Sequence, residues 1–341
     1  MGGMTALEWP LCSPAGYVRH IIPIATAARH SAWCISWGEA QRQSIYSDPL
    51  YLDGYYDVVN GQPKTGLAAA RMAALLTYRS RDSFESRFGR KTQLKAEAKN
   101  TSNRGVLTPP ESPRTPADHA LAAHNDGHRG SLRRPPSVPG LPLTPSPMST
   151  NAQSQSVNNS QSTADSHSQE QPPQPSIFAA QSYLRYQGDK FTARFDANCY
   201  IHISRKLDTH DLARNRIPLP LPHTPEDEIE ALHKALSMLP PSALVISIQT
   251  DGLFTPSEQH EIASYIPGAS LVTIPSPDGH DGFLLEFEAI NQHILRYLHD
   301  RLPELYAGAP ANPSAIQGEG DGFEIKKTSM FGEAEADIAR W

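Results

Sequence analysis

Two polar residues, Asp251 and His280, each follow a short apolar run that predicts a buried strand. The runs cover residues 243–250 and 269–274, so both side chains would lie at the carboxyl ends of strands, where open α/β sheets bind ligands. An acid after one strand and a histidine after a later one is also the order of the last two members of a nucleophilic Ser-Asp-His triad. Solvated loop residues or helix caps would give the same pattern, so both interpretations stand at this point.

The surrounding elements predict a parallel sheet flanked by helices. A β-branched run at 17–26 has the composition of a strand buried on both faces. Apolar residues recur at helical spacing over 31–45 and 283–298, which indicates helices between and after the strands. We therefore expect an α/β fold. His30 directly precedes one of these helices without a partner signature, and we expect it to be structural.

Composition and charge exclude several classes of protein. A net charge of -6 and an isoelectric point near 6.2 supply no basic surface for nucleic acid or an anionic membrane. Cys12, Cys34 and Cys199 show no metal-ligand spacing, so we expect no metal site and a reducing compartment, the cytoplasm. No apolar stretch is long enough for a membrane span, and no signal-peptide pattern follows Met1.

One long segment differs from the rest in composition. Between Gly89 and Ile177 there is no Phe, Tyr or Trp, and Pro, Ser and Gln are abundant. Such a segment cannot bury enough apolar surface to offset its conformational entropy. We predict a disordered insert at residues 95–177. Aromatic residues return at 178–200 with helical spacing, so the insert interrupts ordered structure.

The residues around the two candidate side chains resemble the homoserine O-acetyltransferase family of α/β-hydrolase-fold acyltransferases. Gly279-His-Asp-Gly-Phe-Leu284 and Asp251-Gly-Leu-Phe254 carry the resemblance, which extends through nearly every ordered part of the chain. It implies the C-terminal part of an α/β-hydrolase fold, a parallel sheet flanked by helices, with a helical lid that the disordered insert interrupts. The Pro-rich insert and the tail around 327–335 resemble the fungal form of the family.

The resemblance also divides the chain and places its start. In the family the nucleophilic serine lies immediately before the methionine that matches Met1, so we expect a chain truncated just after that serine and inactive as given. The expected segments are core and first lid helices at 1–94, the insert at 95–177, the second part of the lid at 178–240, core with the catalytic Asp and His at 241–306, and a tail at 307–341.

The implied reaction moves the acetyl group of acetyl-CoA to the hydroxyl of L-homoserine, a step of methionine biosynthesis. In a Ser-Asp-His triad, His280 would be the base and Asp251 would orient it. Acetyl-CoA would be a co-substrate, with no bound cofactor and no metal, and the resemblance allows a homodimer.

Three further residues match the family's amino-acid pocket. Arg71 and Tyr78 are seven residues apart on a predicted helix at 66–78, about two turns along one face. The resemblance implies that the planar guanidinium of Arg71 holds the substrate carboxylate, for which a bidentate fork is suited. Asp281 would pair with the substrate ammonium.

Two alternatives remain open. Serine O-acetyltransfer or O-succinyltransfer would use the same triad, and pocket residues before Met1 would decide between these reactions. A non-catalytic truncated fragment is the other alternative, and its argument is the missing serine. Against it, the residues that would serve the nucleophile are all present.

Overall fold

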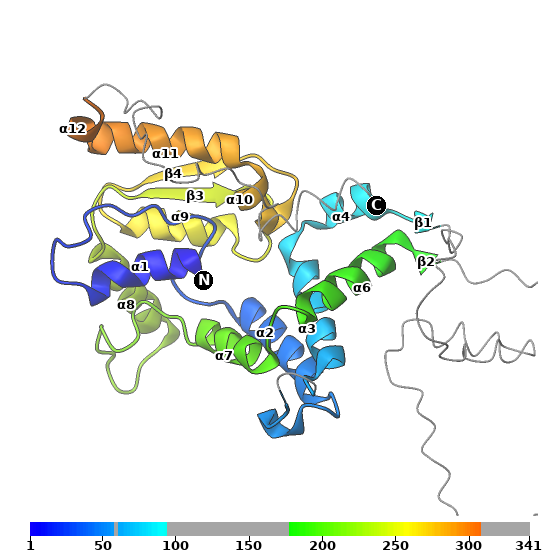
Figure 1. Ribbon diagram of the computed structural model, residues 1–341. Helices are drawn as coiled ribbons and strands as arrows, with labels where there is room; N and C mark the ends of the chain where they lie inside the picture. The colour runs from blue at the N-terminus through cyan, green and yellow to red at the C-terminus, as the bar shows by residue number, and fades with distance from the viewer. Residues whose placement is uncertain (58–60, 94–176, 308–341) are drawn as a thin grey trace, which may run out of the picture. The chain divides into compact units, whose positions relative to one another are not determined.

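A computed structural model describes residues 1–57, 61–93 and 177–307 (Figure 1). The predicted disordered insert at 95–177 lies outside the described residues, apart from Ile177. Nearly all of the expected C-terminal tail lies outside them too.

Two parallel strands form the sheet of the core. β3 (Leu244–Ile248) pairs in parallel with β4 (Ser270–Ile274), and α9 (Pro256–Tyr265) connects them. Both strands were predicted, and the structure makes each slightly shorter than the apolar run that indicated it. Because parallel strands need a crossover connection, the two strands end at the same edge, and the loops that follow them lie together.

The segment predicted as a strand at 17–26 pairs with β3 but forms no regular strand. Ile24 makes an isolated parallel bridge with Ile246, and the N–H of Ala25 donates to the Ile246 carbonyl at 2.9 Å. Pro23 accepts a hydrogen bond from Ile246 at 3.0 Å but has no N–H to donate in return. The ladder is therefore too short to count as a strand, although the segment occupies a strand's place.

Side chains of β3 alternate between two apolar clusters, one on each face. Ile246 and Ile248 pack against α11 (Phe287–Arg301), whereas Val245 faces α9 and α8 (Pro225–Ser237). Figure 1 shows α11 and α9 on opposite sides of the two strands. Every residue of β3 is buried, as expected for a parallel strand covered by helices on both faces.

Helix α8 belongs to this core and not to the lid, which corrects the expected lid segment at 178–240. Thr224 caps the helix: its Oγ1 accepts from the N–H of Asp227, whose carboxylate accepts from the N–H of Thr224. The apolar stripe of α8, including Leu232 and Leu236, is buried in the cluster that contains Val245. Its hydrophobic face therefore covers the sheet.

A second group of helices packs around its own apolar cluster, and we call it the lid. The lid cluster includes Ile45, Leu67, Phe191 and Ile201. Gly66 allows two of these helices to approach closely, since a Cβ there would lie 2.5 Å from the Ser44 carbonyl oxygen. The lid helices are α2 (Ala32–Tyr46), α3 (Lys64–Tyr78), α6 (Ala179–Thr192) and α7 (Ala197–Asp208).

Short elements complete the described chain. β1 (Thr92–Gln93) and β2 (Ile177–Phe178) pair antiparallel, so the structure joins the two ends of the lid that flank residues 94–176. None of the helices within the described ranges is long and apolar enough to cross a membrane. The remaining elements are α1 (Gly2–Cys12), η1 (Leu52–Gly54), α4 (Arg81–Phe88), η2 (Gly279–Asp281), α10 (Gly282–Leu285) and α12 (Pro303–Tyr306).

Candidate active site

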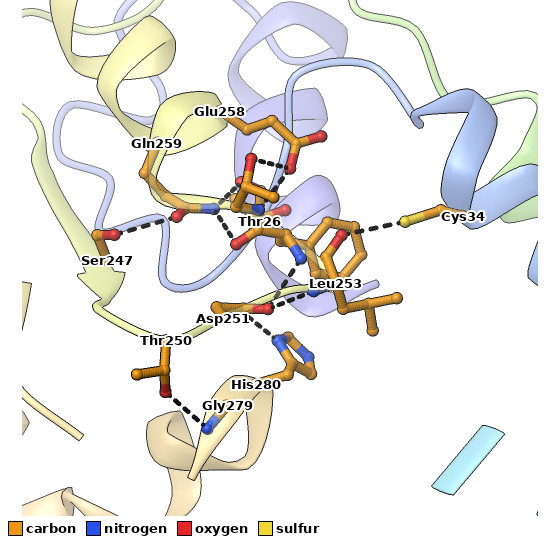
Figure 2. A network of polar contacts seen from close by, with 12 residues as sticks. Thr26, Cys34, Ser247, Thr250, Asp251, Leu253, Glu258, Gln259, Gly279 and His280 are labelled. Atoms are coloured by element: carbon orange, nitrogen blue, oxygen red, sulfur yellow. Dashed lines mark hydrogen bonds and ion pairs between the residues drawn. The ribbon is translucent and has the colours of Figure 1, made fainter. Parts of the chain in front are cut away.

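The structure brings Asp251 and His280 into direct contact. His280 Nδ1 lies 2.7 Å from Asp251 Oδ2, and the Asp251 side chain is fully buried (Figure 2). The other carboxylate oxygen accepts hydrogen bonds of 2.9 Å from the N–H groups of Leu253 and Phe254. Both oxygens of the acid are thus occupied, which fixes the carboxylate while it holds one ring nitrogen of the histidine.

The ends of β3 and β4 explain why this pair forms. Thr250, the residue before Asp251, donates from its hydroxyl to the Ser276 carbonyl at 2.7 Å and accepts from the N–H of Gly279 at 2.9 Å. Gly279 has a φ of +70°, a conformation that favours glycine. One hydroxyl therefore ties the end of one strand to the loop that carries His280.

A buried glutamine supports the turn at Asp251 from the opposite side. Gln259, in α9, donates to the carbonyls of Thr26 and Phe254 at 2.6 and 3.2 Å and accepts from Ser247 at 3.2 Å (Figure 2). Its side chain is fully buried, so its amide satisfies three groups that water cannot reach. Sequence reasoning missed Gln259 and Thr250. Thr250 ends the apolar run that predicts β3, but Gln259 lies among polar residues of α9 and has no comparable signal in the sequence.

His280 faces a cavity of about 640 Å³ between the core and the lid. Its ring centre lies 5.2 Å from that of Phe254 and 4.9 Å from that of Phe283. Among the described residues, none hydrogen-bonds Nε2, which leaves this nitrogen for a ligand. Trp37, Leu207 and other apolar side chains line most of the remaining wall. Apolar surroundings strengthen the electrostatic interactions of the polar groups among them.

Of the three residues expected to bind substrate, two line the cavity and the third lies behind its wall. Tyr78, the last residue of α3, lines the cavity, with its ring centre 6.4 Å from that of His280, and Asp281 also lines it. Arg71 does not belong to the cavity wall. Its guanidinium lies 5.4 Å from the centre of the Tyr78 ring and 5.0 Å from that of Phe191. Arg71 is therefore adjacent to the wall, and its role toward a substrate stays a prediction.

Asp281 already has a protein partner in the structure. Its Oδ2 lies 3.3 Å from Nε of Arg79, and its side chain is 18% exposed. Burial raises the pKa of the Asp281 carboxyl, and the positive charge of Arg79 is the largest influence that lowers it again. Arg79 lies between α3 and α4, so this contact joins the lid to the loop that carries His280.

His30 also lines the cavity, although it was expected to be structural. Burial lowers its pKa to about 4, against the opposing effect of the Asp208 carboxylate. The ring is therefore neutral at physiological pH. Its Nδ1 is buried and, within the described part of the chain, has no hydrogen-bond partner. Nothing in this geometry gives His30 a contact with His280.

The part of the chain that the structure describes contains no cluster of three or more His, Cys, Asp and Glu side chains suited to a metal ion. Its volume of about 640 Å³ is large enough for the cavity to hold the acyl arm of a donor together with a small acceptor.

Comparison with known proteins defines the class of this site. A family model described as alpha/beta hydrolase fold matches residues 1–287, so the chain belongs to that fold class. A strand-end acid paired with a histidine after the next strand agrees with this class.

Within that class, the chain belongs to the homoserine O-acetyltransferase family. It is 53% identical over 378 residues to the homoserine O-acetyltransferase of Cryptococcus neoformans, covering 100% of this chain and 71% of the relative. The enzyme of the same name from Emericella nidulans is 50% identical over 352 residues, with 100% and 67% covered. The chain thus spans about two thirds of the length of these curated relatives.

A solved structure agrees on the fold. The homoserine O-acetyltransferase from Bacillus anthracis has a TM-score of 0.55 at 14% identity, covering 87% of this chain and 57% of that structure. At this identity the likeness supports the fold alone.

Proposed function

We propose that the protein containing this chain transfers the acetyl group of acetyl-CoA to the side-chain hydroxyl of L-homoserine. The products are O-acetyl-L-homoserine and coenzyme A, so acetyl-CoA is a co-substrate and no bound cofactor takes part. The observation that carries the proposal is the buried Asp251 paired at 2.7 Å with a histidine whose second ring nitrogen faces the cavity. The family named above supplies the substrates.

The dyad would act in two half-reactions. In the first, His280 takes a proton from a serine hydroxyl, the oxygen attacks the thioester carbonyl, and the thiol of coenzyme A leaves with that proton. In the second, His280 takes the proton of the homoserine hydroxyl, whose oxygen attacks the acyl-enzyme carbonyl, and the proton passes to the serine oxygen as it leaves. Asp251 would stabilise the imidazolium that forms in each step and keep the ring in the useful tautomer.

The nucleophile itself is proposed from the resemblance and from the cavity. Within the described part of the chain, Ser204 is the one serine that lines the cavity, and its Oγ donates to the Ile201 carbonyl while accepting from Arg42. Met1 lines the same cavity as His280. In the family the serine immediately precedes the methionine that matches Met1, so we assign the nucleophile to that position.

The acceptor is a zwitterion, and the cavity offers partners for both of its charges. Asp281 would accept the ammonium group, and Tyr78 would lie beside it. Arg71, held over the Tyr78 ring, would approach the carboxylate. Two charged contacts would explain how an amino acid competes with water for the acyl group. We further propose that the reaction serves methionine synthesis in the cytoplasm, where the three unpaired cysteines would stay reduced.

The test uses the full-length protein and follows thiol release from acetyl-CoA, with product identity from mass spectrometry. We expect thiol release that depends on L-homoserine, with much slower turnover when L-serine replaces homoserine or succinyl-CoA replaces acetyl-CoA. His280→Ala should abolish the homoserine-dependent release. A preference for L-serine or for succinyl-CoA would show that the protein catalyses serine O-acetyltransfer or O-succinyltransfer instead. Thiol release that no amino acid accelerates would overturn the transferase assignment.

A further inference from the structure

Arg79 bridges two carboxylates of the loop that carries His280. Its Nη1 lies 2.9 Å from Asp278 Oδ1, and its Nε lies 3.3 Å from Asp281 Oδ2. The Arg79 side chain is 7% exposed, so both contacts are shielded from water. A guanidinium presents its donors in a rigid plane and can hold two acids at once, whereas an ammonium offers a single point of charge.

The bridge is part of a wider attachment between the lid and this loop. Ser83 Oγ donates to the same Asp278 oxygen, and Ser80 Oγ donates to the Pro277 carbonyl. Gly279 lies so close to the lid that a Cβ there would be 2.4 Å from the backbone nitrogen of Ser80. The turn between α3 and α4 therefore fixes the loop on the side opposite to Thr250.

The geometry leaves one oxygen of Asp281 for a ligand. Arg79 contacts Oδ2, while no described residue hydrogen-bonds Oδ1, and the residue lines the cavity. Arg79 contacts both Asp278 and Asp281, and the charge of Arg71 also acts on the Asp281 carboxylate. An ammonium group at Oδ1 would add a charge-assisted hydrogen bond at the oxygen that Arg79 does not contact. Arg79 also offsets the effect of burial on Asp281, which would otherwise favour the neutral acid.

We propose that Arg79 is a positioning residue for the acceptor: it holds Asp281 in the orientation in which the free carboxylate oxygen meets the acceptor's ammonium group. This rests on the proposed function, because the ligand is taken to be an amino acid. Arg79 itself contacts neither the acyl donor nor the acceptor. Its effect should therefore fall on recognition of the ammonium and much less on acylation by the donor.

The test compares L-homoserine with 4-hydroxybutyrate, which has the same hydroxyl and carboxylate but no amino group, in the full-length protein. In Arg79→Met, we expect the kcat/KM for homoserine divided by that for 4-hydroxybutyrate to fall by at least about tenfold. The fall should come mainly from a higher KM for homoserine. Arg79→Lys, which keeps the charge but loses the fork, should lie between Arg79→Met and the parent. Thiol release without acceptor should stay within about threefold of the parent.

Asp278→Asn provides the matched control, because it breaks the other half of the bridge without touching Asp281. Its acceptor ratio should stay within about threefold of the parent, even if thermal stability falls. An unchanged ratio in both Arg79 variants would overturn the inference, as would equal losses in both half-reactions, since these indicate a merely structural role. If the parent showed no homoserine-dependent thiol release, the proposed function would fail and this inference with it. An active parent with insensitive Arg79 variants would reject the inference alone.

Discussion

The two walls of the cavity hold their polar side chains by different means. On the core wall, which contains residues 250–254 and 276–284, Asp251 is fixed by two backbone N–H groups and one imidazole. On the lid side, Tyr78 lines the wall at the end of a helix, and Arg71 lies behind it over two aromatic rings. Direct hydrogen bonds to a buried acid tolerate little displacement, whereas ring contacts allow a range of positions.

This difference suggests a division of labour. Proton transfer needs donor and acceptor within hydrogen-bond distance, which the core wall provides before any ligand binds. Recognition of the acceptor can tolerate adjustment as the substrate enters, which the lid wall permits. Arg79 and Gly279 lie where the lid contacts the loop that carries His280, so they join the two walls.

The largest expected effect comes from a substitution of Asp251, the acid that holds His280. Asp251→Asn keeps a carbonyl oxygen for the N–H groups of Leu253 and Phe254 but presents an NH₂ group to His280 Nδ1. The ring would then carry its proton on Nε2, which is the wrong tautomer for a base. We expect kcat for acetyl transfer in the full-length protein to fall by about 10³–10⁴. Thermal unfolding should change little, and a loss below about tenfold would show that Asp251 does not orient the base.

The next largest effect is expected from a substitution at the contact between lid and core. In Gly279→Ala, the new Cβ would lie 2.4 Å from the Ser80 nitrogen at a φ of +70°, so the lid turn must move away or the His280 loop must shift. We expect up to about 3 kcal/mol of lost stability and a loss of about a hundredfold in kcat/KM. Calorimetry and steady-state kinetics measure the two quantities.

Gly252→Ala is the control for that experiment, because a Cβ at Gly252 would meet no heavy atom within 4 Å. It lies beside Asp251, so it tests whether any added methyl group near the dyad is harmful. We expect parent-like stability and activity. Equal effects of the two alanines would show that the close approach of lid and core at Gly279 has no special importance.

The comparison also explains what the sequence could predict. Both strands and helix α3 followed from local apolar patterns, whereas the pairing of Asp251 with His280 was expected from strand-end positions together with the family resemblance. The bridge from Arg79 to Asp278 and the bonds of Gln259 to Thr26 join residues about 200 positions apart, and no local pattern encodes such pairs. The segment at 17–26 forms no regular strand because Pro23 lacks the N–H that the ladder needs. Its β-branched composition predicted a strand and did not take this missing donor into account.

A moderate effect should follow from a change at Arg71, which lies behind the lid wall. Arg71→Lys keeps a positive charge but loses the planar group that lies over Tyr78 and Phe191. We expect homoserine use to weaken by roughly 1–3 kcal/mol in kcat/KM, with acylation by acetyl-CoA changing much less. Arg90→Lys is the control, since Arg90 lies over the ring of Phe178 at 5.2 Å and lines no part of the cavity. If both half-reactions fell together, Arg71 would be structural.

The smallest expected effect concerns stability and belongs to His30, where lid and core adjoin the cavity. Burial lowers the pKa of His30 to about 4, while the unfolded chain has a value near 6.5. Between these values the unfolded state binds a proton that the folded state does not, so stability is complete above pH 6.5 and is lost as the pH falls toward 4. Because the ring is only half-buried and partly screened by solvent, we expect a loss of about 1 kcal/mol.

His30→Phe removes this titration while keeping a ring beside Phe254, whose centre lies 6.1 Å from that of His30. Thermal unfolding measured from pH 7 to pH 4 should therefore give a flatter curve for the variant than for the parent. Both proteins keep His210, whose pKa burial also lowers, so some acid sensitivity remains and only the difference reports on His30. The exposed His202 of α7 supplies the control, and His202→Gln should follow the parent. Parallel curves for His30→Phe and the parent would mean that water reaches the ring, and the cavity wall at His30 would then be open in solution.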